Sequence, residues 1–347
     1  DYYASRGLGD VYKRQVYNHT GREFFAFADI LENGEKSKYR DWYFIDGFPL
    51  KSEWGEIPNF KCFGYYGGMP KLNLKNPEVE KYITDVACYW IKECDIDGWR
   101  LDVGDEISHF FWKNFRKAVK AVKKDMLIIG EIWHYAGDFL EGDEWDTVMN
   151  YPFYLNLIDL LADEKITVSQ FVQNLGYLKG RLHKNCYPLM WNLIDSHDTA
   201  RFLHLCNDNK KKQHLAAAFQ LLLPGMPMIY YGDEYAMPGA NDPDCRRGMY
   251  WDEEYQDKEM YEWYKRLIQV RKSHACIVEG ELAGSVTEDE EGTVVLIRKN
   301  GEETIAMIFN CSSSAKKFNE YTQKYNLLTE NTFDGNVEGF DAAVIVL

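Results

Sequence analysis

The chain has 347 residues, enough for two domains of ordinary size or for one large barrel with an appendage. Lys and Arg total 40 against 55 Asp and Glu, and the formal net charge of −15 makes nucleic acid and membrane surfaces poor candidates for partners. No stretch approaches the roughly 20 apolar residues of a membrane span, and eight cysteines without close pairs or disulfide-scaffold density indicate reduced thiols in the cytoplasm.

The first fifteen residues do not resemble the sequence that follows them. Residues 5–15 show no period of 2 or 3.6 and run without a turn signal into the apolar residues at 16–17. Residues 10–15 (DVYKRQ) resemble the conceptual translation of a sequencing adapter. We therefore expect residues 1–15 to be non-native and the true upstream sequence to be missing, and we exclude them from the fold prediction. The alternative is a genuine connection between a helix and a strand.

Beyond residue 15 the chain alternates between strand and helix signals. Residues 20–75 are rich in Gly, Pro and aromatic side chains and predict a long irregular excursion. Apolar runs predict strands at residues 98–103, 126–131, 189–194 and 228–231, and helical spacing predicts helices over about residues 77–94, 110–122, 168–182, 210–223 and 258–271. This order is typical of an α/β domain in which helices cover a parallel sheet.

The pattern changes after Cys276. Strand runs at residues 293–298, 304–309 and 342–347 are separated by acidic turns that carry Gly and Ser. We therefore predict an all-β domain over residues 275–347, preceded by the α/β domain over residues 16–274.

Polar side chains cluster directly after the apolar runs. The clusters are Asn18 with His19, Asp102, Glu131, and His197 with Asp198. Because the carboxyl ends of parallel strands share one face, these residues would converge although they lie far apart in the sequence. A single acid in this position is as often a helix N-cap, but three such acids beside Arg or His favour a reaction site.

Paired carboxylates are what glycosidic cleavage requires: one is ionised and faces the sugar carbon, and the other is protonated and releases the leaving oxygen. Arg100 lies two residues before Asp102, so both side chains point to one side of the strand and the guanidinium would keep this carboxylate ionised. Glu131 has no cation beside it in the sequence and lies among isoleucines, a setting that favours the protonated acid. Asp102 is therefore the candidate nucleophile and Glu131 the candidate general acid.

These clusters resemble the ordered motifs of the α-amylase family of glycoside hydrolases, family 13. Residues 16–19 (VYNH) are similar to the end of its first conserved region, residues 98–103 (GWRLDV) to the second, residues 130–134 (GEIWH) to the third and residues 196–198 (SHD) to the fourth. Residues 69–73 (MPKLN) resemble a loop motif of the neopullulanase, cyclomaltodextrinase and maltogenic amylase subgroup. The resemblance covers nearly everything after residue 15.

The resemblance implies roles for the residues at matching positions. Asp102 would be the nucleophile, Glu131 the general acid/base and Asp198 the third acid, which stabilises the transition state. The residues that would surround the bound sugar are Asn18, His19, Arg100, Trp133, His134, His197, Asp242 and Arg246. The resemblance also implies a (β/α)8 TIM barrel that here lacks its first strands, and a homodimer formed through an N-terminal domain that is absent from this sequence.

The activity implied is that of a retaining hydrolase of α-1,4-glucosidic bonds in maltooligosaccharides, cyclodextrins or pullulan. The alternatives are a transglycosylating or α-1,6-acting member and a carbohydrate-binding relative without catalysis. We predict no cofactor and no required metal, because the sequence shows no clustered oxygen ligands. The first conserved region normally begins with Asp at the position of Arg14, and a barrel begun at its third strand has an open seam. We therefore expect the chain as written to fold poorly or to be inactive.

Overall fold

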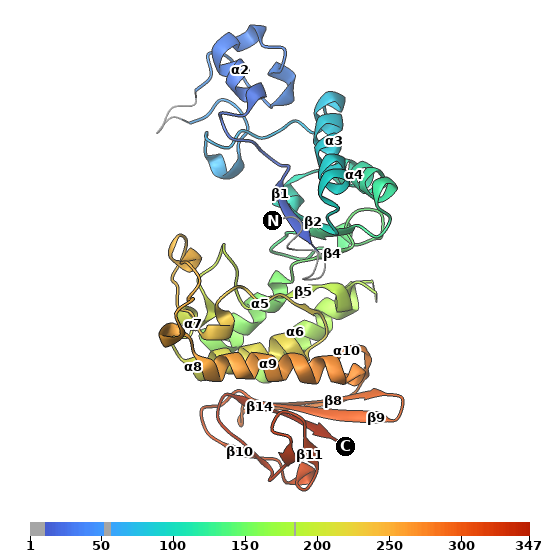
Figure 1. Cartoon of the computed structure of the whole chain (residues 1–347), viewed down its shortest axis with the longest axis vertical. Coiled ribbons are helices and arrows are strands. Elements are labelled where there is room, and N and C mark those ends of the chain that lie inside the picture. The colour runs from blue at the N-terminus through green and yellow to red at the C-terminus, as the bar shows by residue number, and fades with distance from the viewer. Residues whose placement is uncertain (1–10, 52–56, 184) are drawn as a thin grey trace. The chain divides into compact units, whose positions relative to one another are not determined.

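The computed structural model of the chain describes residues 11–51, 57–183 and 185–347 and divides into two compact units (Figure 1). Unit 1 comprises Asp1–Ile132 and Ala136–Met149, and unit 2 comprises Trp133–Tyr135 and Asn150–Leu347. Residues 1–10 of the segment expected to be non-native lie outside the described residues. Across the described part of the chain, every helix is too short or too polar to span a bilayer.

Unit 1 is built on a four-stranded sheet whose strands are all parallel, as the alternation of strands and helices predicts. Its strands, in spatial order, are β1 (Tyr12–Val16), β2 (Gly98–Asp102), β3 (Leu127–Gly130) and β4 (Thr147–Val148). Its helices are α2 (Phe25–Asn33), α3 (Pro77–Cys94) and α4 (His109–Val122). Arg100 of β2 lies opposite Arg14 of β1 and Ile129 of β3, so the carboxyl ends of these three strands lie at the same edge of the sheet.

The helices α3 and α4 begin where the sequence supplies a cap. The side chain of Asn76 accepts a hydrogen bond from the backbone N–H of Glu78, and Pro77 occupies the first turn of α3, where its missing N–H costs nothing. The Ser108 hydroxyl accepts from the backbone N–H of Phe111 at the start of α4. The two helices pack against each other, and both agree with the predicted bounds to within a residue.

Unit 2 combines helices with a C-terminal antiparallel sheet. Its helices are α5 (Tyr151–Leu157), α6 (Val168–Arg181), α7 (Phe202–Leu205), α8 (Lys210–Leu222), α9 (Lys258–Ser273) and α10 (Ala275–Glu279). Two parallel strands, β5 (Trp191–Asn192) and β6 (Met226–Pro227), pair with each other. The six-stranded sheet has the order β12 (Asn331–Thr332), β11 (Tyr325–Asn326), β14 (Asp341–Val346), β9 (Glu303–Asn310), β8 (Thr293–Asn300) and β7 (Glu281–Glu288), and β10 (Lys316–Lys317) pairs with β13 (Asn336–Val337).

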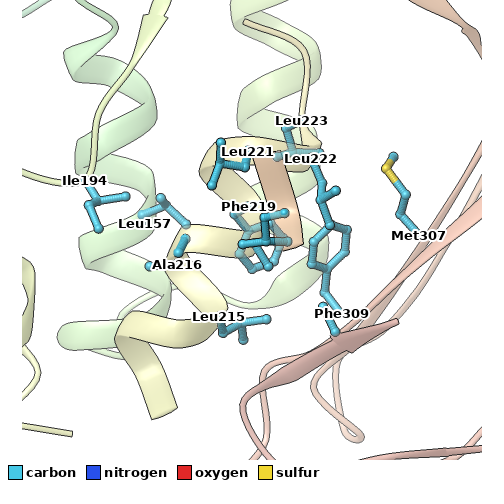
Figure 2. Packing of buried hydrophobic residues seen from close by; sticks show 14 of the residues in the cluster. Leu157, Ile194, Leu215, Ala216, Phe219, Leu221, Leu222, Leu223, Met307 and Phe309 are labelled. Atoms are coloured by element: carbon cyan, nitrogen blue, oxygen red, sulfur yellow. The ribbon is translucent and has the colours of Figure 1, made fainter. Parts of the chain in front are cut away.

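The core of unit 2 lies between helix α8 and the antiparallel sheet (Figure 2). Residues 215–222 of α8 are all buried, as expected for a helix that packs on every side. The ring of Phe219 stacks on that of Phe309 in β9, with centroids 4.2 Å apart and planes at 12°. Full burial of such a side chain stabilises a fold by roughly 1.5–3 kcal/mol. This packing joins the helices of unit 2 and the C-terminal sheet in one core.

The structure differs from the prediction at residues 228–231, which do not form a strand. The paired segment is β6, and the ladder ends where the backbone N–H of Met228 donates to the carbonyl of Asn192 at 2.8 Å. Strand β5 is only two residues long, so the apolar residues 229–231 have no further backbone to pair with. The predicted strand at 189–194 is shortened to β5, because Leu189 ends a 3-10 helix at Tyr187–Leu189 and the partner strand β6 also has only two residues.

Several further elements were not predicted, and three of them are instructive. Helix α2 lies inside the excursion that the sequence indicated to be irregular. Strand β7 is an edge strand whose two faces are both largely exposed, so it lacks the apolar alternation that identifies a half-buried strand. Residues 12–15, which we excluded from the fold prediction, form most of β1 and pair with β2. Their origin in an adapter stays a prediction.

Candidate active site

The two candidate catalytic acids lie at the ends of neighbouring strands in unit 1. Asp102 is the last residue of β2, and Glu131 directly follows β3. The backbone N–H of Glu131 donates to the carbonyl of Leu101 at 2.9 Å, so the pairing of the two strands continues up to the acids. Asp102 is 7% exposed and Glu131 5% exposed. The sheet therefore holds two nearly buried carboxyl groups at one edge.

A single guanidinium contacts both acids. Nη1 of Arg100 is paired with Oδ1 of Asp102, and Nη2 lies 2.8 Å from Oε1 of Glu131. The first contact confirms that the i, i+2 spacing places Arg100 and Asp102 on one side of the strand. Glu131 has no cation beside it in the sequence, but strand pairing brings Arg100 to it from another segment. Arg100 thus fixes the carboxyl groups relative to each other.

The backbone around Glu131 is shaped to hold this side chain. Oε2 of Glu131 accepts a hydrogen bond from the backbone N–H of Val103 at 2.9 Å. Val103 has a φ of 50°, a left-handed conformation that costs a β-branched residue of order 1–3 kcal/mol. A Cβ at Gly130 would overlap the indole of Trp145, so only glycine fits directly before the acid.

Asn18 and His19 follow β1 at the same edge of the sheet. The Asn18 amide donates to Oε2 of Glu106 at 2.9 Å, and Lys71 forms an ion pair with the same oxygen at 2.8 Å. His19 stacks on Phe63, with ring centroids 5.1 Å apart. Burial lowers the pKa of His19, although nearby Asp102 has the opposite effect, so the neutral imidazole is favoured at neutral pH.

Two residues of this region were missed at the sequence level. Glu106 links Asn18 to Lys71, and its position four residues after Asp102 was the available signal. Arg14 contacts the candidate nucleophile: Nε and Nη2 lie 2.8 and 2.7 Å from Oδ1 of Asp102. Arg14 is directly opposite Arg100 in the sheet, and this register could not be read from a segment that was excluded from the fold.

The remaining charged candidates belong to unit 2, where they contact one another. Arg246 forms ion pairs with Oδ1 of Asp198 at 3.0 Å and with Oδ1 of Asp242 at 2.8 Å. Its Nε also donates to the backbone carbonyl of His197 at 2.9 Å. Nε2 of His197 lies 3.0 Å from Oδ2 of Asp198. Residues from two distant segments, 197–198 and 242–246, therefore form one partly exposed polar group.

The aromatic candidates Trp133 and His134 also belong to unit 2. Trp133 stacks on Tyr151, with centroids 4.2 Å apart and planes at 12°, and 42% of its surface is exposed. Nδ1 of His134 lies 3.2 Å from the carbonyl of Tyr135. Within the described residues, no group of three or more His, Cys, Asp or Glu side chains is placed to hold a metal ion.

A nearly buried pair of carboxyl groups at the carboxyl edge of a parallel sheet, joined by one arginine, is a site for acid–base and nucleophilic chemistry of the kind that cleaves glycosidic bonds. The profile of the family described as "Alpha amylase, catalytic domain" matches residues 11–280. The chain belongs to this family.

Curated relatives and solved structures agree with that assignment. The chain is 46% identical over 300 residues to a cyclomaltodextrinase of Geobacillus thermopakistaniensis (strain MAS1), a match that covers 86% of this chain and 51% of the relative. It is 41% identical over 296 residues to an intracellular maltogenic amylase of Bacillus subtilis, with coverage of 85% and 50%. A solved cyclomaltodextrinase structure superposes with a TM-score of 0.93 at 35% identity and covers 99% of this chain and 61% of that one. These names confirm the subgroup indicated by residues 69–73, and the chain spans about half the length of these curated relatives.

Proposed function

We propose that the protein from which this chain comes is a retaining glycoside hydrolase that cleaves α-1,4-glucosidic bonds in cyclodextrins, maltooligosaccharides or pullulan. The observation that carries the proposal is the single Arg100 guanidinium that contacts both Asp102 and Glu131. The names of the relatives support glucans as the substrates. Retention requires the two carboxyl groups to lie roughly 5–5.5 Å apart across the scissile bond.

Asp102 is the nucleophile in the proposed reaction. Both guanidinium contacts of Asp102 are to Oδ1, so we assign the attack on the anomeric carbon to Oδ2. The bond from this carbon to the leaving oxygen breaks while the proton of Glu131 passes to that oxygen, which leaves a glycosyl ester on Asp102. In the second step Glu131 takes a proton from water, the water oxygen attacks the anomeric carbon, and the ester bond to Asp102 breaks.

The other candidates bind the sugar in this proposal. Asp198 is the third acid and holds sugar hydroxyls, a role supported by its exposure and by its ion pair with Arg246. His197, Asp242, Asn18, His19, Trp133 and His134 complete the binding site. His19 acts as a neutral hydrogen-bonding group, since burial lowers its pKa.

The proposal extends to the whole protein. Upstream strands would close the parallel sheet into a (β/α)8 barrel, and an N-terminal domain would form a homodimer, as the subgroup resemblance implies. A cytoplasmic location is supported by the eight free cysteines and by a relative that is named as intracellular.

The test uses the chain joined to its native upstream sequence, recovered from its genomic locus. We expect hydrolysis of β-cyclodextrin, pullulan and starch, with α-configured products seen by proton NMR before mutarotation. β-Configured first products would contradict retention, and binding without hydrolysis would contradict the enzyme. Acceptor transfer or cleavage of α-1,6 bonds in preference to α-1,4 bonds would replace the proposed specificity.

A further inference from the structure

Unit 2 contains a second pair of acids, remote in sequence from Asp102 and Glu131 and much more deeply buried. Asp195 lies three residues before Asp198, and Asp233 begins a short 3-10 helix at Asp233–Tyr235. Asp195 and Asp233 are each 1% exposed, and Arg201, which lies beside Asp233, is not exposed at all. Acids are almost never buried to this degree without partners.

The hydrogen bonds of this pair require a proton. Oδ2 of Asp195 accepts from the backbone N–H of Phe202 at 2.7 Å, and Oδ1 of Asp233 accepts from Nη1 of Arg201 at 3.1 Å. Among the described residues, the other two oxygens, Oδ1 of Asp195 and Oδ2 of Asp233, have no N–H donor although both are buried. The two carboxyl groups lie within hydrogen-bonding reach of each other. Two carboxylates cannot share a hydrogen bond unless one of them is protonated.

The charges around the pair favour one retained proton. Burial raises the pKa of Asp195 to about 6, and burial together with the charge of Asp195 raises the pKa of Asp233 well above its ordinary value. The groups that face the pair are Arg201, Glu234, Tyr264 of α9 and Tyr154 of α5. Among these described groups Arg201 is the one cation and can balance one carboxylate of the pair; a second would be unbalanced, and Glu234 adds further negative charge.

We infer that Asp195 and Asp233 share one proton and so act as positioning residues for the segment that carries His197 and Asp198. The shared hydrogen bond ties this segment to the 3-10 helix at Asp233–Tyr235. At the other end of the segment, the backbone N–H of Arg201 donates to the carbonyl of Gly239, at the start of the loop that leads to Arg246. The shared proton stands independently of the reaction, whereas its effect on catalysis rests on the proposed function.

Asp233→Asn is the discriminating variant. The asparagine amide donates to Oδ1 of Asp195 at every pH, and its carbonyl oxygen accepts from Arg201 as Oδ1 of Asp233 does. Glu234→Gln is the matched control, because it removes one negative charge at the next position and leaves the pair intact. Asp195→Asn serves as a second variant, since its carbonyl oxygen still accepts from the N–H of Phe202.

Infrared difference spectroscopy tests the proton directly. The wild type is the chain with its native upstream sequence. When the spectrum of its Asp233→Asn variant is subtracted from the wild-type spectrum at pH 7, the difference should show the C=O stretch of a protonated carboxylic acid. The difference against Glu234→Gln should lack it. Absence of the band from both Asp233→Asn and Asp195→Asn difference spectra overturns the shared proton.

The pH dependence of unfolding gives an independent test. Because the folded pKa of each acid is raised, the stability that the pair contributes is complete below the unfolded pKa near 4 and falls as the pH rises through the folded pKa values. Between pH 6 and 8 the retained proton should raise the unfolding constant in urea titrations by about tenfold per pH unit. Asp233→Asn should lose this slope and Glu234→Gln should keep it; equal slopes in all three proteins overturn the inference.

Catalysis gives the last readout. On β-cyclodextrin, kcat of the wild type should fall on the alkaline side where the pair loses its proton, and Asp233→Asn should lack that fall while KM changes little. If Asp233→Asn shows the same alkaline fall in kcat as the wild type while the infrared band is present, the positioning role is contradicted and the shared proton is not. Inactivity of every protein on all glucans, with the band present, contradicts the proposed function and not the shared proton.

Discussion

Two pairs of acids in the described structure each contact an arginine, but the hydrogen-bond donors around the two pairs differ. Asp102 and Glu131 both contact Arg100, and Arg14 and the backbone N–H of Val103 supply further donors. Asp195 and Asp233 have one contact from Arg201 and one backbone N–H between them, and their other two oxygens have no N–H donor among the described residues. Two donor groups contact each acid of the first pair, and one contacts each acid of the second.

In our proposals, the number of donors, and not the residue types, distinguishes the reaction centre from the buried clamp. A carboxyl group that attacks a substrate or exchanges protons with it must be reachable, and Asp102 and Glu131 retain 7% and 5% exposure. A carboxyl pair that keeps a proton inside the protein can hold two segments together with little net charge. Substitutions that remove a charge should therefore change turnover at the first pair and stability at the second.

The largest expected effect is on turnover through the first pair. Asp102→Asn removes the nucleophile and Glu131→Gln the general acid, so each should lower kcat on β-cyclodextrin by at least about 10⁴-fold. Asp105→Asn, an exposed acid on the segment after β2, is the control and should stay within threefold of the wild type. Residual activity within tenfold of the wild type in either acid variant would remove that residue from the mechanism.

The next effect is on stability through the second pair. Arg201→Met removes the cation that balances the buried carboxylate and should lower the free energy of unfolding by about 3–5 kcal/mol in urea titrations. Arg266→Met breaks the exposed ion pair with Glu330 and should cost less than about 1 kcal/mol. Equal losses in the two variants would mean that the buried cluster is not energetically distinct from a surface pair.

Arg100→Lys tests whether one cation must serve both catalytic acids. An ammonium group lacks the planar fork that lets Arg100 contact Asp102 and Glu131 at once. We expect kcat to fall by about 10²-fold, the order found when one preorganised electrostatic contact is removed. Arg116→Lys alters the contact with Asp146, which directly precedes β4, and should have little effect on kcat. Equal kcat in the wild type and Arg100→Lys would show that the bridge is dispensable.

Much of the fold was predictable because its signals are local. The cap at Asn76 and the buried spacing of Val79, Ile83, Ala87 and Ile91 specify α3 without any tertiary information. The run at residues 228–231 misled the prediction because apolarity alone does not supply a pairing partner, and β5 ends at Asn192. Strand β7 was missed because an exposed edge strand carries no apolar period.

The site divides along the same line. The spacing of Arg100 and Asp102 gave their contact correctly, because two residues along a strand return to the same face. The contact of Arg100 with Glu131 depends on the register of two strands, and the proton shared by Asp195 and Asp233 depends on a pairing across 38 positions of sequence. The sequence near these residues carries no signal that predicts either contact.

The smallest expected effect concerns Arg14, the second cation that contacts Asp102. Its side chain is 54% exposed, so water screens the ion pair with Asp102, whose contribution to stability should be below about 1 kcal/mol. Its two contacts nevertheless occupy Oδ1 of the nucleophile, and charge-assisted hydrogen bonds of this kind make a carboxylate less reactive. Where the recovered native sequence also carries Arg at this position, Arg14→Ala should therefore raise kcat on β-cyclodextrin by about threefold to fivefold and leave the urea midpoint nearly unchanged. Lys13→Ala is the control, because the ammonium of Lys13 lies over the ring of Trp90 instead of beside the acid. A fall in kcat for Arg14→Ala would contradict this prediction. It would show that the first pair needs two cations, whereas the second pair has one.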